Sequence, residues 1–325
     1  MTDGSSQALA AAVCAGDRRA LARVLTLVES TRPDHRAQAD ALLTLLLPAT
    51  GRAARVGISG APGVGKSTFI EALGLSLADD GRKVAVLAVD PSSEVSGGSI
   101  LGDKTRMERL SRHPNAFIRP TPSGGALGGV ARRSRETLLV MEAAGHEVAL
   151  VETVGVGQSE TAVAEMTDSF LLLLAPAGGD ELQGIKKGIV ELADLLVVTK
   201  ADGDLLAVAE RARSDYAGAL AILAPSSGWQ PPVLSCSAAT GQGIAEVWQA
   251  IGRHREALGP DGMAQKRSVQ ARRWMWREVE DGLMTALRAD PEVAARLAPL
   301  ERDVAAGRTT PAEAAQELLK AFRPG

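Results

Sequence analysis

Cysteine and histidine are scarce in this chain of 325 residues, which contains two of the first and four of the second. Cys14 and Cys236 lie far apart and form neither a C-x-x-C motif nor a disulfide framework. This usage is typical of a reducing compartment, so we expect a cytoplasmic protein. A metal centre of the His/Cys kind is not expected, because no second ligand stands at helical spacing from any of the histidines, which are His35, His113, His146 and His254.

Aromatic residues, excess charge and long apolar runs are also rare. Aromatics make up 3% of the chain, so the core must consist mainly of Leu, Val, Ile and Ala. The net charge of −3 and the pI of about 5.9 indicate no basic surface for nucleic acid. The longest apolar run, at 170–177, is far shorter than the ~20 residues of a membrane helix, and the N-terminus lacks the pattern of a secretion signal. We therefore expect neither a nucleic-acid partner nor a membrane partner.

The spacing of apolar residues divides the chain into three regions. Residues 1–50 carry Leu and Ala at helical spacing, interrupted at Pro33, and predict an N-terminal extension of two or three helices. Residues 51–260 alternate short apolar runs with longer helical segments. Residues 261–325 predict a C-terminal helical arm, in which the segment 266–288 has an apolar stripe.

The middle region has the order strand, helix, strand that is typical of a doubly wound α/β fold. Its apolar runs are mostly continuous, as in strands that are buried on both faces of a parallel sheet. We predict strands at residues 55–59, 83–89, 147–152, 169–175, 194–200 and 231–237. The helices predicted between or after them span 66–79, 130–144, 184–193, 204–222 and 243–257. The predicted fold class is therefore α/β, with a mostly parallel sheet.

A phosphate-binding motif follows the first predicted strand. Residues 60–67 read GAPGVGKS and match G-x-x-x-x-G-K-[ST], with a predicted helix after them. The glycines let backbone amides turn toward phosphate oxygens, and the helix N-terminus adds partial positive charge. Lys66 is predicted to reach the outer phosphates, Ser67 to ligate Mg²⁺, and Thr68 to cap the helix or touch the inner phosphate. The predicted cradle consists of Gly60, Ala61, Pro62, Gly63, Val64, Gly65, Lys66, Ser67 and Thr68.

Two further segments resemble the elements with which GTPases read guanine. TKAD at 199–202 resembles [NT]-K-x-D. Thr199 stands where Asn is commoner, a replacement that many GTPases tolerate and that is expected to weaken one contact. In that element Asp202 accepts hydrogen bonds from the guanine ring N–H and the exocyclic amine, and Lys200 lies along the base. SCSAAT at 235–240 resembles the S-A-x loop, whose backbone amide contacts the guanine carbonyl. We therefore predict binding of GTP and GDP, with a base site made by Thr199, Lys200, Asp202, Ser237, Ala238 and Ala239.

Three acids are placed where ligands gather, beyond the carboxyl ends of parallel strands. Asp90 and Glu152 stand at the ends of predicted strands, and Asp103 lies in a flanking loop. We predict that these acids, together with Ser67, surround Mg²⁺ and the γ-phosphate. The sequence ETVG that begins at Glu152 resembles the switch II element D-x-x-G, with Glu in place of Asp, so the amide of Gly155 is expected to sense the γ-phosphate.

Glycine-rich segments surround this predicted site at residues 96–102, 123–129 and 175–188. Few side chains anchor such segments, which are either ordinary surface loops or switches that couple the nucleotide to a partner. Lys186 and Lys187 are predicted to enter the γ-phosphate region when a partner docks, as an arginine finger does. The residues predicted to act in catalysis are Lys66, Asp103, Glu152 and Lys186.

Three segments together are more specific than any phosphate loop. They are DPSS with GGSILGDKTRM between residues 90 and 107, ETVGVGQSE at 152–160 and GDELQGIKKGI at 179–189. Through these segments the chain resembles the MeaB/ArgK group of GTPases, in the metallochaperone-like branch of P-loop proteins. The resemblance runs from about residue 15 to at least residue 290, and includes the helices at both ends.

This resemblance implies a chaperone of adenosylcobalamin-dependent acyl-CoA mutases, mainly methylmalonyl-CoA mutase. GTP hydrolysis would gate cofactor loading, and the chaperone would protect or rescue the mutase. The resemblance also implies a homodimer through the C-terminal arm, and it allows a cobalamin adenosyltransferase as a further partner. The chain lacks the D-x-H-x-x-G motif that presents a histidine to cobalt, since Asp34 directly precedes His35. We therefore expect that no histidine of this chain binds cobalamin directly.

Two other functions stay open at this level. A nickel-insertion GTPase of the same branch shares the phosphate loop, but brings Cys/His metal ligands that this chain lacks. The ArgK name reflects an assignment as a GTP- or ATP-dependent kinase of periplasmic amino-acid-binding proteins. Such a kinase needs a protein hydroxyl as acceptor and a base to position it, and no feature of the sequence selects one.

Overall fold

The computed structural model describes residues 3–30, 32–89, 107–120, 127–153, 159–176, 187–222 and 228–322. The chain forms two compact units, Met1–Ser268 and Val269–Gly325. The first unit contains a sheet with helices on both faces, and the second is helical. The division into regions at residues 50 and 260 stays a prediction.

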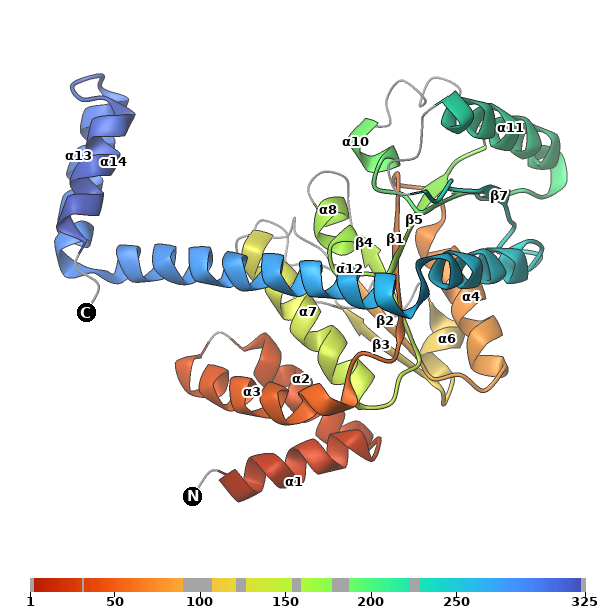
Figure 1. The fold of residues 1–325 in the computed structure, drawn as a ribbon, viewed down its shortest axis with the longest axis horizontal. Helices are drawn as coiled ribbons and strands as arrows, with labels where there is room; N and C mark the ends of the chain where they lie inside the picture. The colour runs from red at the N-terminus through yellow and green to blue at the C-terminus, as the bar shows by residue number, and fades with distance from the viewer. Residues whose placement is uncertain are drawn as a thin grey trace. The chain divides into compact units, whose positions relative to one another are not determined.

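A parallel sheet forms the centre of the larger unit (Figure 1). Its described strands, in chain order, are β1 (Ala54–Gly60), β2 (Val84–Val89), β3 (Ala116–Pro120), β4 (Val148–Thr153), β5 (Ser169–Leu174), β6 (Leu195–Val198) and β7 (Val233–Ser235). They are arranged in the order β3-β2-β4-β1-β5-β6-β7, and each neighbouring pair is parallel. The chain leaves β1 toward β2 and leaves β4 toward β5, in opposite directions across the sheet, which is the doubly wound arrangement that the sequence predicted.

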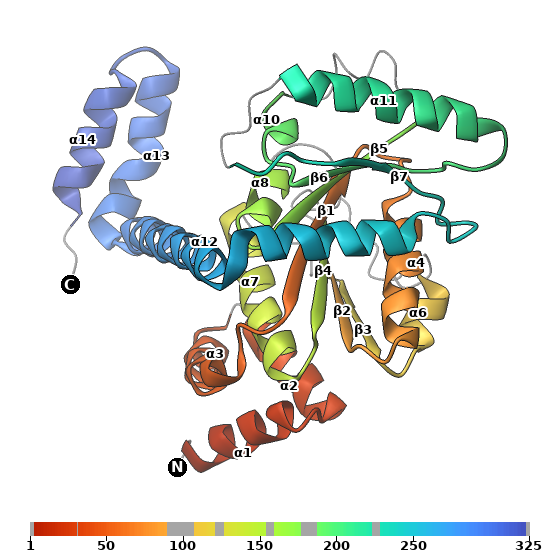
Figure 2. The ribbon, with the colours of Figure 1, turned by 45° about the vertical axis from the view of Figure 1, so that its right-hand side comes forward.

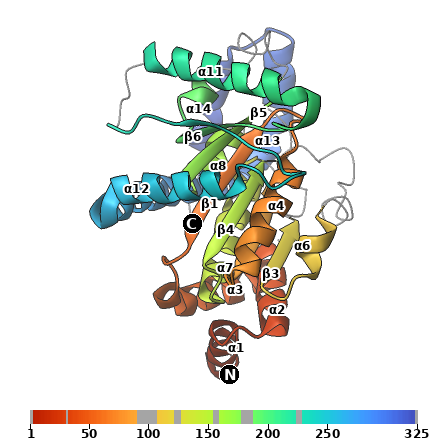
Figure 3. The same ribbon diagram turned by 90° about the vertical axis from the view of Figure 1, so that its right-hand side faces the viewer.

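Helices cover both faces of this sheet (Figure 2). They are α1 (Asp3–Cys14), α2 (Arg18–Glu29), α3 (Pro33–Leu46), η1 (Leu47–Ala49), α4 (Lys66–Asp79), α6 (Glu108–Arg112), α7 (Leu127–Ala143), α8 (Ser159–Ala164), α10 (Lys187–Val190), η2 (Gly203–Leu205), α11 (Leu206–Ile222) and the first part of α12 (Ile244–Ala289). On one face α4 and α6 lie side by side, and Phe69, Leu110 and Val247 share one core with the strands (Figure 3). On the other face α7, α8 and α11 pack on the strands, and α1, α2 and α3 pack on α7.

Buried ion pairs join the N-terminal helices to the α/β core. Arg36 on α3 donates to the Glu136 carboxylate on α7, with Nη1 2.7 Å from Oε2. Arg119 on β3 pairs with Glu29 at the end of α2, with Nε 2.8 Å from Oε1. The side chains of Glu29 and Glu136 are almost fully buried, and Glu136 also pairs with Arg132. Loss of Arg119 would therefore leave the buried Glu29 carboxylate without the cation that pairs with it here. The predicted N-terminal extension is therefore an integral part of this unit.

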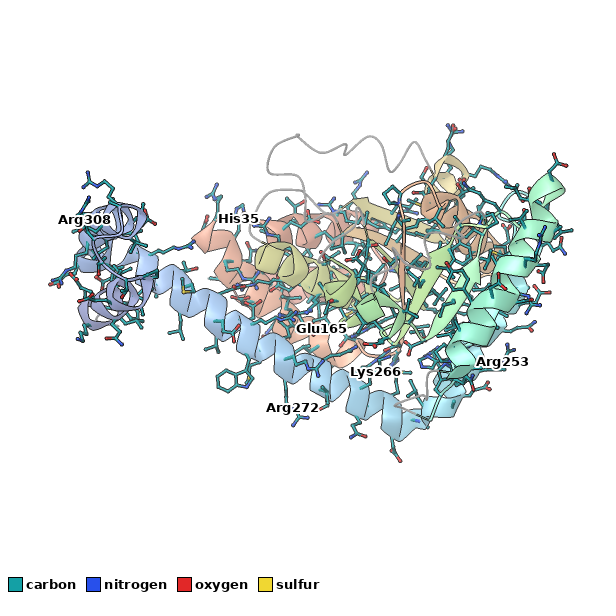
Figure 4. The ribbon with its side chains drawn as sticks, turned by 90° about the horizontal axis from the view of Figure 1, so that it is seen from above. His35, Glu165, Arg253, Lys266, Arg272 and Arg308 are labelled. Atoms are coloured by element: carbon teal, nitrogen blue, oxygen red, sulfur yellow. The ribbon has the colours of Figure 1, made fainter. Side chains whose placement is uncertain are left out.

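Helix α12 consists of two helical parts that meet at a kink. Gly259 has φ 64° and ψ 176°, outside the helical region, and Pro260 follows it. The helix that was predicted to end at 257 therefore meets the next helix at a kink. Beyond the kink, Lys266 (labelled in Figure 4) donates through Nζ to the Asp168 carbonyl oxygen at 2.6 Å. Arg267 donates through Nε to the buried Asp168 carboxylate at 2.8 Å, so this part of α12 is fastened to the start of β5.

The smaller unit is helical, as predicted for the C-terminal arm. It contains the end of α12, α13 (Pro291–Ala305) and α14 (Pro311–Ala321). Asp290 and Thr310 cap α13 and α14 through side-chain bonds to backbone amides. Helices α13 and α14 pack on each other, around Val293 and Ala314. Among the described residues of the whole chain, every helix is too short or too polar to cross a lipid bilayer.

The sequence did not predict three short elements of the larger unit. β3 is an edge strand whose five residues include Arg119 and Pro120, so it lacks the continuous apolar run of the inner strands. Helices α6 and α8 have five and six residues, too few for a helical period to stand out. These elements are recognisable only from their place beside longer ones.

Candidate functional site

The predicted phosphate loop connects the end of β1 to the start of α4. β1 ends at Gly60 and α4 begins at Lys66, so residues 61–65 form the turn between them. Gly65 precedes the helix with φ 97°, a left-handed conformation that other residues rarely adopt. A Cβ at Gly60 would lie 2.6 Å from the carbonyl oxygen of Leu173 on β5. Glycine is therefore required at both ends of the turn, for different reasons.

The Lys66 side chain lies across this turn. Its Nζ donates to the carbonyl oxygens of Gly60 at 2.8 Å and Ala61 at 3.3 Å. Val64 is buried beneath the turn, whereas Thr68 is exposed on the first turn of α4. The turn thus places an ammonium group beside the N-terminus of a 14-residue helix, where an anion is stabilised by both charges.

Two predicted Mg²⁺ ligands meet at the ends of neighbouring elements. Ser67 on α4 donates through Oγ to Oε1 of Glu152 at 3.1 Å. Glu152 lies near the carboxyl end of β4, opposite Ile58 of β1, and is 4% exposed. A hydroxyl and a carboxylate are hard oxygen donors of the kind that Mg²⁺ prefers, so this pair fits the ion. Of the other predicted ligands, Asp90 and Asp103 lie outside the described residues.

Thr199 and Lys200 join the predicted base site to the phosphate loop. Thr199 directly follows β6, and its Oγ1 lies 2.7 Å from the carbonyl oxygen of Val64 and 3.2 Å from that of Leu174. Lys200 donates through Nζ to the carbonyl oxygen of Gly63 at 2.8 Å, with its own φ at 55°. Thr199 therefore holds the loop through its hydroxyl, although a weakened contact was expected at this position, where Asn is commoner.

Asp202 and Ser237 lie together at the ends of β6 and β7. The Ser237 hydroxyl donates to the Asp202 carboxylate, and the Ala201 amide donates to the Cys236 carbonyl at 3.0 Å. Burial raises the pKa of the Cys236 thiol to about 12, so this side chain stays neutral beside the site. Ala238 and Ala239 follow directly and are progressively more exposed. The two segments that resemble guanine-reading elements are thus brought to one place from positions about 35 residues apart.

Four predicted site residues lie outside the described residues: Asp90, Asp103, Gly155 and Lys186.

A contact behind the site was not predicted from the sequence. The unpredicted contact joins Thr153 to Ser59, whose hydroxyls lie 3.0 Å apart in the core. The only signal for it in the sequence is a polar residue near the end of each of two otherwise apolar strands.

Replacement of Thr199 by valine is expected to weaken binding of GDP about three- to tenfold. Valine keeps the shape of threonine but leaves the buried Val64 carbonyl without its donor, and one such hydrogen bond contributes about 0.5–1.5 kcal/mol. Titration of a fluorescent GDP analogue measures the effect, with Thr26→Val on the exposed side of α2 as the matched control. Wild-type affinity in the Thr199 variant would show that the hydroxyl does not support the loop.

Comparisons with known proteins agree with this geometry. The model of the family "Methylmalonyl Co-A mutase-associated GTPase MeaB" matches residues 21–292. A putative GTPase of Caulobacter vibrioides is 59% identical over 310 residues, which cover 95% of each chain. The mitochondrial methylmalonic aciduria type A homolog of Mus musculus is 47% identical over 323 residues, which cover 95% of this chain and 77% of that protein. A crystal structure of an LAO/AO transport system kinase matches with a TM-score of 0.78 and 38% identity, over 98% of each chain.

The family match thus includes the phosphate loop, the base site, α3 and α12. The relatives at this level of identity are named GTPases or proteins of methylmalonic aciduria type A. The chain therefore belongs to the MeaB family of methylmalonyl-CoA mutase-associated GTPases, and is itself a GTPase that binds guanine nucleotide.

Proposed function

We propose that this GTPase is a chaperone that gates the loading of adenosylcobalamin onto an acyl-CoA mutase, and that protects or reactivates the mutase. Methylmalonyl-CoA mutase is the proposed client. The observation that carries this proposal is the match of residues 21–292 to a family named for its association with that mutase. A cobalamin adenosyltransferase is proposed as a second partner, because the loaded cofactor must first be adenosylated.

The proposed nucleotide site uses the residues that the fold gathers at the carboxyl ends of β1, β4, β6 and β7. Lys66 would exchange its two backbone acceptors for the outer phosphates of GTP. Asp202, oriented by Ser237, would accept hydrogen bonds from guanine. Ser67 and Glu152 would hold Mg²⁺, whose charge stabilises the negative charge that develops on the phosphoryl oxygens. Asp90, Asp103 and Gly155 are proposed to complete this site.

The test of the client is GTP turnover by the full chain, alone and with methylmalonyl-CoA mutase from the same organism. We expect a low basal rate that rises at least about tenfold when the mutase is added, as for GTPases whose site a partner completes. An unrelated cobalamin enzyme that is not an acyl-CoA mutase serves as the control. Hydrolysis that no acyl-CoA mutase changes would leave the GTPase assignment intact and contradict the chaperone proposal.

Lys186→Ala is expected to remove most of the mutase-dependent increase in rate, so that the stimulated rate falls toward the basal rate, while the basal rate changes much less. The reason is that Lys186 is proposed to enter the γ-phosphate region only in the complex, as an arginine finger does. Steady-state hydrolysis of GTP with and without mutase measures both rates, and Lys187→Ala tests the neighbouring amine. Equal losses in both rates would instead assign Lys186 to the basal reaction.

A homodimer through the C-terminal arm is also proposed. The second half of α12 exposes apolar side chains at spacings of three, four and seven residues, namely Met275, Trp276, Val279, Leu283 and Met284. Trp276 alone is 60% exposed, and such a stripe is typical of a helix that packs on a partner. Light scattering of the full chain should show a dimer, which Trp276→Glu with Leu283→Glu should convert to a monomer. A monomeric wild-type chain would contradict the proposal.

A cytoplasmic location is proposed, because both cysteines are free.

A kinase activity is the second candidate function, favoured by the similarity to the LAO/AO transport system kinase. GTP or ATP labelled on the γ-phosphate separates the two reactions. Label in free phosphate supports the GTPase alone, whereas label in a protein band supports phosphoryl transfer to a side chain.

A further inference from the structure

A buried hydrogen bond joins the two strands that carry the phosphate loop and Glu152. Thr153 Oγ1 donates to Ser59 Oγ at 3.0 Å, and the two residues are 0% and 2% exposed. Ser59 directly precedes Gly60, the first residue of the phosphate motif, and Thr153 directly follows Glu152. The bond therefore lies one residue before the phosphate motif on β1 and one residue after Glu152 on β4.

The two hydroxyls face away from the nucleotide. Ile58 and Glu152 are opposite each other in the β1–β4 pair, and Ile58 belongs to the core beneath α4. Successive side chains of a strand point to opposite faces, so Ser59 and Thr153 face the other side of the sheet, where α7 and α8 pack. Neither hydroxyl can touch Mg²⁺ or GTP from that face, and any effect on the site must act through position.

The Ser59–Thr153 hydrogen bond lies directly after the last backbone pair between β1 and β4. The register of β1 with β4 runs from Ala54 opposite Val148 to Ile58 opposite Glu152. Beyond that point β1 continues its pairing with β5 only, through Gly60. The side-chain bond thus extends the junction between β1 and β4 by one residue, at the place where the phosphate loop leaves the sheet.

We propose that Ser59 and Thr153 are positioning residues of the magnesium site. Their hydrogen bond holds the ends of β1 and β4 together, which keeps the Glu152 carboxylate within reach of Ser67 Oγ, 3.1 Å away. Loss of the bond lets the two strand ends separate, and Mg²⁺ is then held less tightly over the bound nucleotide. This inference rests on the proposed role of Ser67 and Glu152 as Mg²⁺ ligands.

The test is a binding measurement that does not depend on hydrolysis. The dissociation rate of a fluorescent GDP analogue is measured with Mg²⁺ and again with excess EDTA, and the ratio of the two rates reports how strongly Mg²⁺ retains the nucleotide. Thr153→Val and Ser59→Ala are each expected to reduce this ratio about three- to tenfold, the effect of one hydrogen bond. Thr153→Ser, which keeps the donor, should retain the wild-type ratio.

Two further variants make the result specific. The double variant Ser59→Ala with Thr153→Val should lose no more than either single variant, because both changes remove one bond. Thr167→Val removes a different buried hydroxyl on the same face, which donates to the Val163 carbonyl at 2.8 Å. It should lower the melting temperature without changing the ratio. If the ratio fell equally in the Thr167 variant, the effect of the Ser59 and Thr153 variants would come from a general loss of core packing. That result would overturn the inference.

The variant Glu152→Gln tests separately whether Glu152 is a Mg²⁺ ligand, which the inference about Ser59 and Thr153 assumes. This variant should reduce the Mg²⁺ ratio more than the hydroxyl variants do. A wild-type ratio in Glu152→Gln would overturn the proposed metal ligand and the inference with it. A reduced ratio in Glu152→Gln, together with wild-type ratios in Thr153→Val and Ser59→Ala, would overturn the inference alone.

Discussion

Replacement of Lys66 by alanine is expected to lower the affinity for GTP and GDP by a factor of about 10² to 10⁴. The ammonium donates two hydrogen bonds to the turn, and we expect the same donors to meet two phosphate oxygens when a nucleotide binds. Hydrogen bonds to charged groups contribute about 1.5–3 kcal/mol each, so the loss of two amounts to about 3–6 kcal/mol. Isothermal titration calorimetry with GDP and Mg²⁺ measures this loss directly.

The control for this variant is Lys83→Ala. Lys83 is an exposed lysine just before β2, at the opposite end of the strands from the phosphate loop, so its removal should leave the affinity for GDP unchanged. Thermal unfolding of both variants shows whether α4 still folds without the Lys66 bonds to Gly60 and Ala61. Tight GDP binding by a folded Lys66 variant is incompatible with residues 60–68 as the nucleotide cradle.

Asp202→Asn is expected to remove the preference for guanine, with affinity for GTP falling about 10²-fold or more and affinity for xanthosine triphosphate rising. The carboxylate accepts from the ring N–H and the exocyclic amine of guanine, whereas an amide offers one acceptor and one donor. A buried donor that loses its acceptor costs about 1–3 kcal/mol, and more beside a charged group. Competition of GTP, XTP and ATP against a fluorescent GDP analogue measures the change in specificity.

Ser237 and Asp204 supply the controls for this experiment. Asp204→Asn changes an exposed carboxylate two residues along and should leave the nucleotide preference unaltered. Ser237→Ala removes the hydroxyl that donates to Asp202, and should weaken all guanine nucleotides without favouring xanthine. If Asp202→Asn kept the wild-type ratio of GTP to XTP affinity, the base reader would have to lie elsewhere in the chain.

The parts of the structure that the sequence predicted well are those decided by local patterns. The predicted helix at 66–79 coincides with α4, because a glycine with positive φ precedes Lys66 and the helical period continues to Asp79. Each of the six predicted strands overlaps an observed strand, because continuous apolar runs suit a sheet that is buried on both faces. The doubly wound fold follows from the alternation of these runs with helices.

Predictions failed or were silent where a residue's role depends on neighbours that are distant in the chain. β3 contributes an edge strand although Arg119 and Pro120 interrupt its apolar character. Thr199 seemed a weaker substitute for Asn, yet it reaches the Val64 carbonyl, 135 residues away. Its short side chain is sufficient because β6 ends close beside the phosphate loop, a proximity that the order of strands creates.

The sequence by itself determined the kind of chemistry: a phosphate loop, a base reader and acids at strand ends, each recognisable within a few residues. Only the tertiary structure decided which of these residues meet, as Ser67 with Glu152 over 85 positions and Ser59 with Thr153 over 94 positions. The physical reason is that an apolar pattern states which face of an element is buried, but not which other element covers it. That choice is made by the strand order, which places β1 between β4 and β5.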